Sequence, residues 1–258
     1  MLYITLKYYT KSSFVTQLEA FLLKRILSLC RAAVDKYGMI SAGDRIAVGV
    51  SGGKDSLVLL YALARLRSFY PVQFEIVAVT LDYQFGGKCG DFSEIEALCK
   101  QLNIEYIIKR TNLWEVIFET RQEKNPCSLC AKMRRGILHD TAKANGCNKV
   151  ALGHHLDDAA ETFTMNLFSG GRIGCFSPIS YLSNKELYLI RPLIFARESE
   201  VTSAAKRLNL PITKSKCPAD KETERQTVKN LLKTLEKDYP AIQKKIVGAL
   251  ERGEIDGW

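Results

Sequence analysis

The regular alternation of short apolar segments with longer amphipathic ones, between residues 44 and 194, most constrains the fold of this chain. The short segments are rich in β-branched residues and have the length of strands, whereas the longer ones carry apolar residues at helical spacing. Strands that alternate with helices build βαβ units, in which the strands lie parallel and the helices cover the sheet. The pattern therefore predicts an α/β fold with a doubly wound parallel sheet.

The same periodicities give approximate bounds for each element. Strands are predicted at 44–51, 74–82, 104–110, 148–154 and 186–194, and helices at 14–38, 55–69, 91–103, 127–146 and 156–171. Asp91 is the expected N-cap of the helix at 91–103. We expect three parts: an N-terminal helical extension (1–38), a central α/β domain (39–197) and a basic C-terminal helical segment (198–258).

Composition narrows the class of protein. The chain has 258 residues, of which 47% are hydrophobic and 25% charged, so a packed globular core is expected. Its net charge of +9 favours partners that carry phosphate. The sequence has no apolar run of about eighteen residues, and its first segment lacks the order of a signal peptide. We therefore expect a cytoplasmic protein without a membrane span.

The string SGGKDS joins the first predicted strand to the following helix, where helix N–H groups attract anions. It is not a Walker loop, because Val48 stands where that pattern has glycine and Asp55 follows the lysine. Its glycines let backbone N–H groups approach a phosphate, and its hydroxyls and lysine add donors. The alternative is a strand-to-helix turn without a ligand. The candidate ligand residues are Ser51, Gly52, Gly53, Lys54, Asp55 and Ser56.

Ligands of parallel sheets bind beyond the carboxyl ends of the strands, so the segments ending at Ser51, Asp82 and His154 are expected to converge. We predict that Gly153 and His154 contact a nucleotide and that Asp157 helps to hold Mg²⁺. Asp82 is a further candidate for contact with the nucleotide. The alternatives are capping of the next helix by its aspartates and, for Asp82, a turn at the strand end.

The chain has eight cysteines, and one pair, Cys127 and Cys130, is closely spaced. Residues i and i+3 at a helix start share one face, which suits a metal or a cluster. Four interpretations are open: a redox pair, a structural zinc site, an iron–sulfur site completed by Cys217, and two unrelated buried cysteines.

The quoted motifs together resemble one family. SGGKDS resembles the pyrophosphatase loop of the N-type ATP pyrophosphatases, also called PP-loop proteins. Four further segments resemble the tRNA 2-thiocytidine synthetase family of that superfamily, and the similarity extends from about residue 36 to 240. The segments are CSLCAKMRRGIL (127–138), VALGHHLDDAAET (150–162), IRPLIFARESEV (190–201) and KCPADKETERQTVKNLL (216–232).

The resemblance implies an adenine nucleotide alpha hydrolase-like fold for 39–197 and ATP-dependent thiolation of tRNA. It implies ATP and Mg²⁺ at the loop, with Lys54 and Asp55 as catalytic residues. It also implies a [4Fe–4S] cluster held by Cys127, Cys130 and Cys217, whose fourth iron delivers sulfide. An anticodon-loop cytidine is the expected target. Glu161 departs from the family, which usually has glutamine there, and is more typical of lysidine synthetases.

Basic residues near the cysteines fit a track for the phosphate backbone of tRNA. The alternative is an ordinary solvated charged face. A sulfide or persulfide donor such as a cysteine desulfurase is the expected second partner, and a homodimer is expected as a possible assembly. The rival functions are lysidine-type modification and a zinc-stabilised RNA-binding module without turnover. The candidate tRNA-binding residues are Lys132, Arg134, Arg135, Lys214, Lys216, Arg225 and Lys229.

Overall fold

A six-stranded sheet forms the centre of the computed structural model, which describes residues 23–120, 126–213 and 224–258. The strand order is β3-β2-β1-β4-β6-β5, and every neighbouring pair is parallel except β5 and β6. The predicted doubly wound α/β class is confirmed. The strands are β1 (Arg45–Gly49), β2 (Glu75–Asp82), β3 (Glu105–Arg110), β4 (Lys149–Ala151), β5 (Ile179–Leu182) and β6 (Leu187–Ile190).

The strand β5 was missed by the sequence prediction. It pairs antiparallel with β6 through a short turn, in which Glu186 has a positive φ of 51°. Each of these strands has only four residues, and Tyr181 in β5 is half exposed, so β5 shows little apolar alternation. The strand predicted at 186–194 ends at Ile190, before Pro192, whose ring nitrogen has no proton to donate to a ladder.

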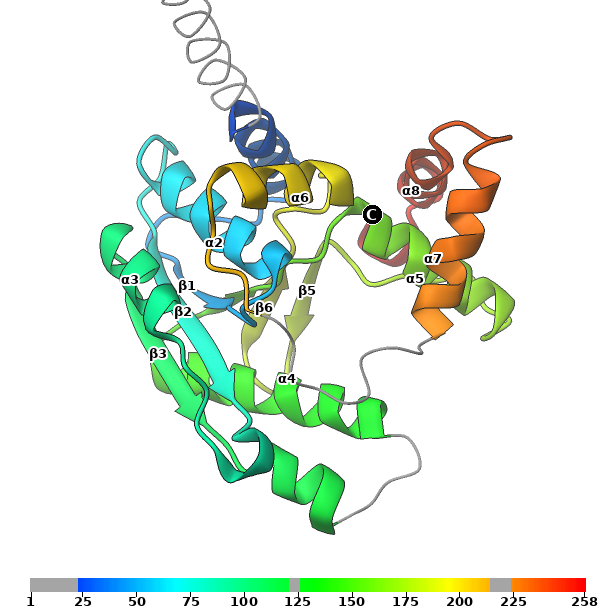
Figure 1. Cartoon of the computed structure of the whole chain (residues 1–258). Coiled ribbons are helices and arrows are strands. Elements are labelled where there is room, and N and C mark those ends of the chain that lie inside the picture. Colours follow the sequence, from blue (N-terminus) through cyan, green and yellow to red (C-terminus); the bar gives the residue numbers. More distant parts are fainter. Residues whose placement is uncertain (1–22, 121–125, 214–223) are drawn as a thin grey trace, which may run out of the picture.

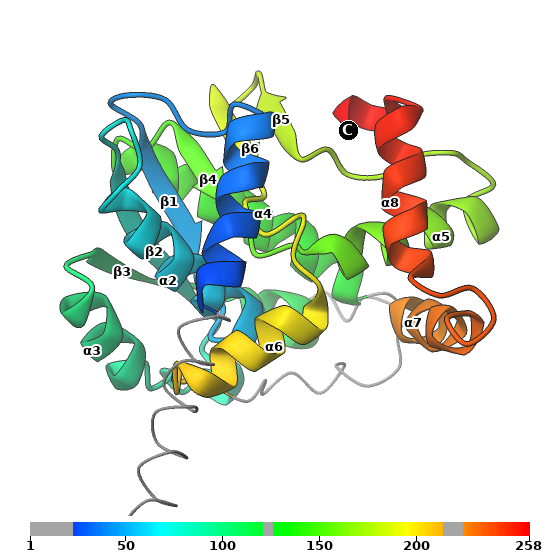
Figure 2. The same cartoon turned by 90° about the horizontal axis from the view of Figure 1, so that it is seen from above.

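Helices cover both faces of the sheet (Figures 1 and 2). The helix α4 (Pro126–Ala144) lies against one face, where Leu138 and Ala142 are buried against strand residues. The opposite face carries the helix over residues 23–36, α2 (Lys54–Arg67), α3 (Ser93–Gln101) and α6 (Glu198–Arg207).

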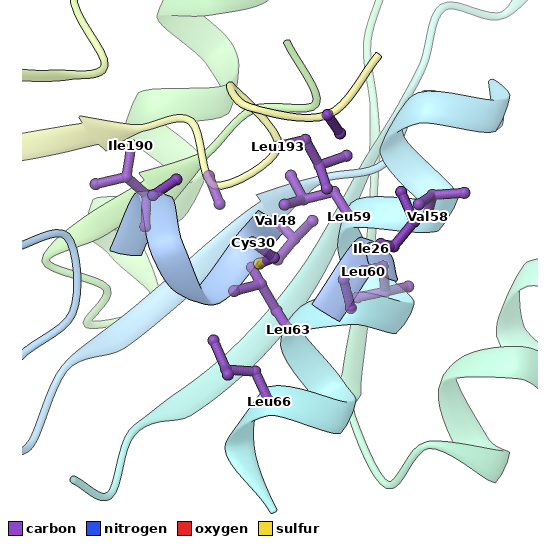
Figure 3. Packing of buried hydrophobic residues seen from close by; sticks show 14 of the residues in the cluster. Ile26, Cys30, Val48, Val58, Leu59, Leu60, Leu63, Leu66, Ile190 and Leu193 are labelled. Atoms are coloured by element: carbon purple, nitrogen blue, oxygen red, sulfur yellow. The ribbon is translucent and has the colours of Figure 1, made fainter. Parts of the chain in front are cut away.

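The larger core lies between the sheet and these helices (Figure 3). Val48 of β1, Leu59 and Leu63 of α2, and Cys30 are at 0% exposure, and Ile190 of β6 lies in the same cluster. Burying each large aliphatic side chain contributes roughly 1.5–3 kcal/mol. The strong apolar run after SGGKDS therefore fixes α2 against β1 and so fixes the position of the loop between them.

Three further helices lie beside the sheet: α5 (Leu156–Phe168), α7 (Glu224–Leu235) and α8 (Ile242–Arg252) (Figure 2). Val228 and Leu232 of α7 are buried against Ala160 of α5. After α8, the short η3 (Ile255–Gly257) leads to Trp258, which belongs to the larger core. Packing is therefore continuous across residue 198, and the three-part division of the chain stays a prediction.

Element bounds differ modestly from those predicted. Residues 23–36 are helical and Gly38 has a φ of 57°, while the predicted start of that helix, residues 14–22, lies outside the described residues. The N-cap of α3 is Phe92, and the carboxylate of Asp91 accepts the Ser93 N–H at 3.0 Å. A π-helical turn, η2 (Glu115–Thr120), was not predicted. In the described part of the chain, no helix combines the length and the apolar character needed to span a membrane.

Candidate nucleotide and sulfur-transfer site

The SGGKDS loop connects β1 to α2, and its backbone is shaped to leave N–H groups available. Gly52 has a φ of 81°, a left-handed conformation that favours glycine. The hydroxyl of Ser56 accepts the Ser51 N–H at 3.1 Å and donates to the Gly53 carbonyl at 2.9 Å, which closes the turn. Gly53 is the N-cap of α2 and makes no side-chain cap, so the first turn of α2 offers N–H groups to an anion.

Lys54 extends from the first turn of α2 between two carboxylates. Its Nζ lies 2.9 Å from Asp55 Oδ1 and 3.3 Å from Glu198 Oε1 of α6. Burial works to lower the pKa of Lys54, but the hydrogen bond and charge of Asp55 and the charge of Glu198 outweigh it, so the pKa is raised. The ammonium group is therefore charged at neutral pH and lies beside the SGGKDS loop.

Glu198 is shared by two lysines. Its second oxygen lies 2.6 Å from Lys229 Nζ of α7. Burial works to raise the pKa of Glu198, but the hydrogen bond and charge of Lys229, together with Lys54, lower it to about 2. Sequence reasoning had not selected Glu198 as a site residue, although it stands in the IRPLIFARESEV motif.

The end of β4 lies directly beside the loop. A Cβ on Gly153 would come within 2.9 Å of the backbone carbon of Asp55, so only glycine permits this close approach. The helix α5 begins with a capping box in which Asp158 Oδ2 accepts the His155 N–H at 2.9 Å and His155 Nδ1 accepts the Asp158 N–H at 3.3 Å. Gly153 is thus next to Asp55, as the carboxyl-end rule requires. His155 Nε2 also lies 3.7 Å from Asp55 Oδ1, whereas the ring of His154 packs against Phe176.

Asp157 is engaged by protein groups on both oxygens. Oδ1 lies 3.1 Å from Arg197 Nε, and Oδ2 accepts the Glu198 N–H at 2.7 Å, so Asp157 caps α6. It is only 8% exposed. This geometry matches the predicted alternative of helix capping, although the capped helix is α6 rather than α5. Asp157 could bind Mg²⁺ directly only if these contacts broke. Its role in binding Mg²⁺ stays a prediction.

Asp82 organises the loop after β2. It is 4% exposed, and its two oxygens accept the N–H groups of Gln84 and Gly90, each at 3.1 Å. These bonds match the turn role that was the alternative to nucleotide contact. The proposed contact with the nucleotide stays a prediction.

The cysteine-bearing end of α4 lies beyond the carboxyl edge of the sheet. Leu138 covers Gly49, the last residue of β1, where a Cβ would lie 2.9 Å from Leu138 Cδ2. Cys130 is eight residues earlier, which is about 12 Å along a helix. It is half-buried, and Cys127 stands one turn before it in the same helix. In the part of the chain that the structure describes, no group of three metal-ligating residues assembles.

The third predicted cysteine, Cys217, lies outside the described residues, as do Lys214 and Lys216. Thr213, the last described residue before them, donates its N–H to the Gly52 carbonyl at 3.0 Å. Its side chain closely covers the position where Gly52 would carry a Cβ. Thr213, four residues before Cys217 in the sequence, is therefore in direct contact with the SGGKDS loop, which sequence reasoning had not anticipated.

The predicted tRNA-binding residues divide into two groups. Lys132, Arg134 and Arg135 are exposed on α4 beside Cys130. Arg225 and Lys229 of α7 instead turn toward α5 and α6, where Arg225 Nη1 lies 2.9 Å from Asp158 Oδ1. The structure thus brings the second pair to the nucleotide side of the site, where they hold α7 in place.

Comparison with known proteins agrees with this geometry. Residues 22–235 match the family of PP-loop domains, so the chain is a PP-loop protein. It is 38% identical over 230 residues to the tRNA-cytidine(32) 2-sulfurtransferase of Geobacter sulfurreducens, covering 88% of this chain and 89% of that protein. It is 39% identical over 235 residues to the Pelobacter propionicus protein of the same name, covering 90% and 87%. The chain belongs to the tRNA-cytidine(32) 2-sulfurtransferase family.

A solved structure extends the likeness to three dimensions. The U34-tRNA thiolase NcsA from Methanococcus maripaludis, determined with its [4Fe–4S] cluster, has a TM-score of 0.74 and 28% sequence identity. The match covers 91% of this chain and 79% of the thiolase. The predicted family, its α/β fold and its class as an ATP-dependent tRNA-thiolating enzyme are confirmed, whereas the roles of individual residues stay predictions.

Proposed function

We propose that this protein activates an anticodon-loop cytidine of tRNA with ATP and replaces the oxygen of its carbonyl group with sulfur. The observation that carries the proposal is that the phosphate-binding loop and the cysteine-bearing end of α4 lie at the same edge of the sheet. The SGGKDS loop and Lys54 offer a site for polyphosphate, and the cysteine-bearing turn of α4 lies beyond the same edge. The named relatives modify cytidine 32, and the same position is proposed here.

In the first step, the carbonyl oxygen of the base attacks the α-phosphorus of ATP. A new P–O bond forms, the bond from the α-phosphorus to the bridging oxygen breaks, and pyrophosphate leaves with the bonding electrons. Negative charge grows on the leaving pyrophosphate, where the N–H groups of α2 and the Lys54 ammonium stabilise it. Adenylation is needed because a ring carbonyl oxygen is otherwise a poor leaving group.

In the second step, hydrosulfide adds to the activated ring carbon and gives up its proton. The C–O bond then breaks, and AMP leaves with the bonding electrons. Cys127, Cys130 and Cys217 are the residues proposed to hold a [4Fe–4S] cluster. Thiolates are the ligands that iron–sulfur clusters prefer, and a cluster held by these three cysteines would supply iron that can bind sulfide.

Chain length permits this assembly. Cys217 is the fourth residue after Thr213, and four extended residues reach about 14 Å at most. Thr213 donates its N–H to the Gly52 carbonyl of the loop, so this length of chain is short enough to let Cys217 reach the nucleotide site. The exposed cations on α4, Lys132, Arg134 and Arg135, are proposed to contact the tRNA backbone.

The remaining partners belong to the same proposal. Mg²⁺ is expected to accompany ATP, with its protein ligand supplied after rearrangement around Asp157. A cysteine desulfurase or free sulfide would supply sulfur. We expect the enzyme to be cytoplasmic and to assemble as a homodimer.

Substitution of one cysteine tests the proposed ligand set. Cys217→Ser should lower thiolation of tRNA at least a hundredfold and leave the Kd for ATP within twofold of the original. The control is Cys147→Ser, because Cys147 is buried at the other end of α4 and burial raises the pKa of its thiol. Iron content and nucleoside mass spectrometry are the measurements. Undiminished thiolation and iron content in Cys217→Ser would remove Cys217 from the cluster.

A further inference from the structure

Arg191 is a buried cation without a carboxylate partner among the described residues. It directly follows β6 and is 7% exposed. Its Nη1 donates to the Ser177 carbonyl, its guanidinium carbon lies 4.8 Å above the centre of the Phe176 ring, and its Nε has no hydrogen-bond partner. Burial lowers the pKa of Arg191 to about 10, so it is charged at neutral pH.

Another buried cation of this protein, Lys149, has both a counter-ion and a hydrogen-bond acceptor. Lys149 is 5% exposed, and its Nζ lies 2.7 Å from Asp44 Oδ2 and donates to the Met39 carbonyl at 3.0 Å. A buried charge without such a counter-ion is costly. The environment of Arg191 is therefore incomplete in the way expected of a site that receives an anion.

A second unsatisfied polar group lies beside Arg191. The ring of His154 is 4.9 Å from the ring of Phe176, the same ring that Arg191 covers, and His154 Nδ1 is buried without a partner. Burial, and then the charge of Arg191, lower the pKa of His154 to about 4, so its imidazole is neutral at neutral pH. A neutral imidazole can add a hydrogen bond to an anion without adding charge.

Both residues follow strands that end at the same edge of the sheet as the SGGKDS loop. The strands β4 and β6 are parallel neighbours, with Ala151 opposite Ile190, so His154 and Arg191 leave the same edge. On one side of His154 in the chain, Gly153 lies against the backbone of Asp55, and on the other, His155 Nε2 lies 3.7 Å from Asp55 Oδ1. Arg191 thus stands two strands from β1, on the side of His154 away from the loop.

We propose that Arg191, together with His154, binds the phosphate group that stays on the nucleoside, the α-phosphate of ATP and then of AMP. This inference rests on the proposed adenylation chemistry. A guanidinium presents donors in a fixed fork that matches two phosphate oxygens. Lys54 and the loop would hold the pyrophosphate half, so the two products of the first step have separate cationic sites. Arg191 is then a residue that contacts the reacting phosphate.

The stability of the ligand-free protein gives the first test. Arg191→Met removes a buried charge that has no counter-ion, so the Tm should be unchanged or higher. Lys149→Met is the matched control, and its Tm should fall because it leaves the buried carboxylate of Asp44 without its counter-ion, with only the hydrogen bonds from the Ser41 N–H and the Asn148 amide. Arg191→Lys keeps the charge and should resemble the original protein. A fall in the Tm of Arg191→Met as large as that of Lys149→Met would make Arg191 structural and would overturn the proposal.

Binding of the two product halves gives the second test, by calorimetry at fixed ionic strength. Arg191→Met should weaken AMP binding at least tenfold and leave the Kd for pyrophosphate within twofold. Lys54→Met should do the reverse. Equal AMP affinity in Arg191→Met and the original protein would overturn the proposal. So would an Arg191→Met protein that binds AMP normally and loses only its binding to a short RNA oligonucleotide. Failure of the original protein to bind AMP would overturn it as well. Absence of tRNA thiolation, with the AMP result as expected, would instead count against the proposed function.

Discussion

Glu161 shows how a single side chain can depart from a family pattern and keep the same physical character. It is 4% exposed, and burial followed by the nearby charge of Asp158 raises its pKa to about 7, against the opposing effects of Lys229 and Arg225. Much of Glu161 is therefore protonated near neutral pH. A protonated carboxyl is neutral and can donate a hydrogen bond, as a glutamine side chain can.

A pH-dependent stability measurement checks this account. The folded protein keeps the proton on Glu161 up to about pH 7, whereas the unfolded chain releases it near 4.5, so this group makes stability fall as pH rises between these values. Glu161→Gln removes that fall. The free energy of unfolding of the variant, relative to the original protein, should rise by on the order of 1–3 kcal/mol from pH 4.5 to 8.

The control for this measurement is Glu224→Gln, which changes an exposed glutamate at the start of α7. It removes the same carboxylate charge without changing a buried group, so the pH-dependent gain expected of Glu161→Gln should be absent from this variant. A difference for Glu161→Gln that is equally flat between pH 4.5 and 8 would show that Glu161 is ionised throughout, contrary to the account.

The sequence predicted individual site residues unevenly. Gly153 lies against the Ser51–Ser56 loop as expected, because strand ends and a glycine turn are local patterns that the sequence displays. Glu198 and Arg191 were missed, because a long-range ion pair and an unpaired buried charge have no local signature. Asp82 was predicted to contact the nucleotide and Asp157 to help hold Mg²⁺. The structure shows the carboxylate of each accepting hydrogen bonds from backbone N–H groups.

At the scale of elements, Glu198 couples α6 to the loop and to α7. It occupies one side of Lys54 and binds Lys229 with its other oxygen. Glu198→Gln should leave Lys54 freer to bind phosphate and so lower the Kd for ATP about three- to tenfold, a change on the order of 1 kcal/mol, as for other partly exposed ion pairs. Titration calorimetry with ATP at low salt is the measurement.

Glu200→Gln is the matched control on the same helix. Glu200 caps α6 by accepting the Arg197 N–H at 2.8 Å and pairs with Arg25, so it has no contact with Lys54. The Kd of the Glu200→Gln protein for ATP should not change. Weaker ATP binding in Glu198→Gln would contradict the account, because it would mean that Glu198 assists ATP rather than competes with it.

The helix α7 is attached by an apolar face as well as by ions. Leu232 is 2% exposed and packs with Ala160 and Val228, whereas its neighbour Leu231 is 37% exposed. Leu232→Ala should lower the free energy of unfolding by about 2–4 kcal/mol, because it leaves a cavity. Leu231→Ala should change it by less than about 0.5 kcal/mol. Equal losses in urea unfolding would contradict the packing described for α7.

At the scale of the whole molecule, the sequence predicted the parallel sheet because apolar strands alternate with amphipathic helices over most of the chain. It did not predict β5, whose four residues are too few and too exposed to show a period. Nor did it predict that Val247, Leu250 and Trp258 would share a core with β1, since contacts between distant segments leave no periodic pattern. The C-terminal helices thus belong to the frame that holds the site.

The central claim is that one edge of this sheet joins ATP-driven activation to sulfur transfer. The most direct test is nucleoside mass spectrometry of tRNA after incubation with ATP, Mg²⁺, sulfide and protein purified without oxygen. The account predicts 2-thiocytidine, formed only with ATP and by protein that contains iron, together with release of AMP and pyrophosphate. A colourless, zinc-loaded protein that adds no sulfur, or one that produces lysidine without iron, would contradict it.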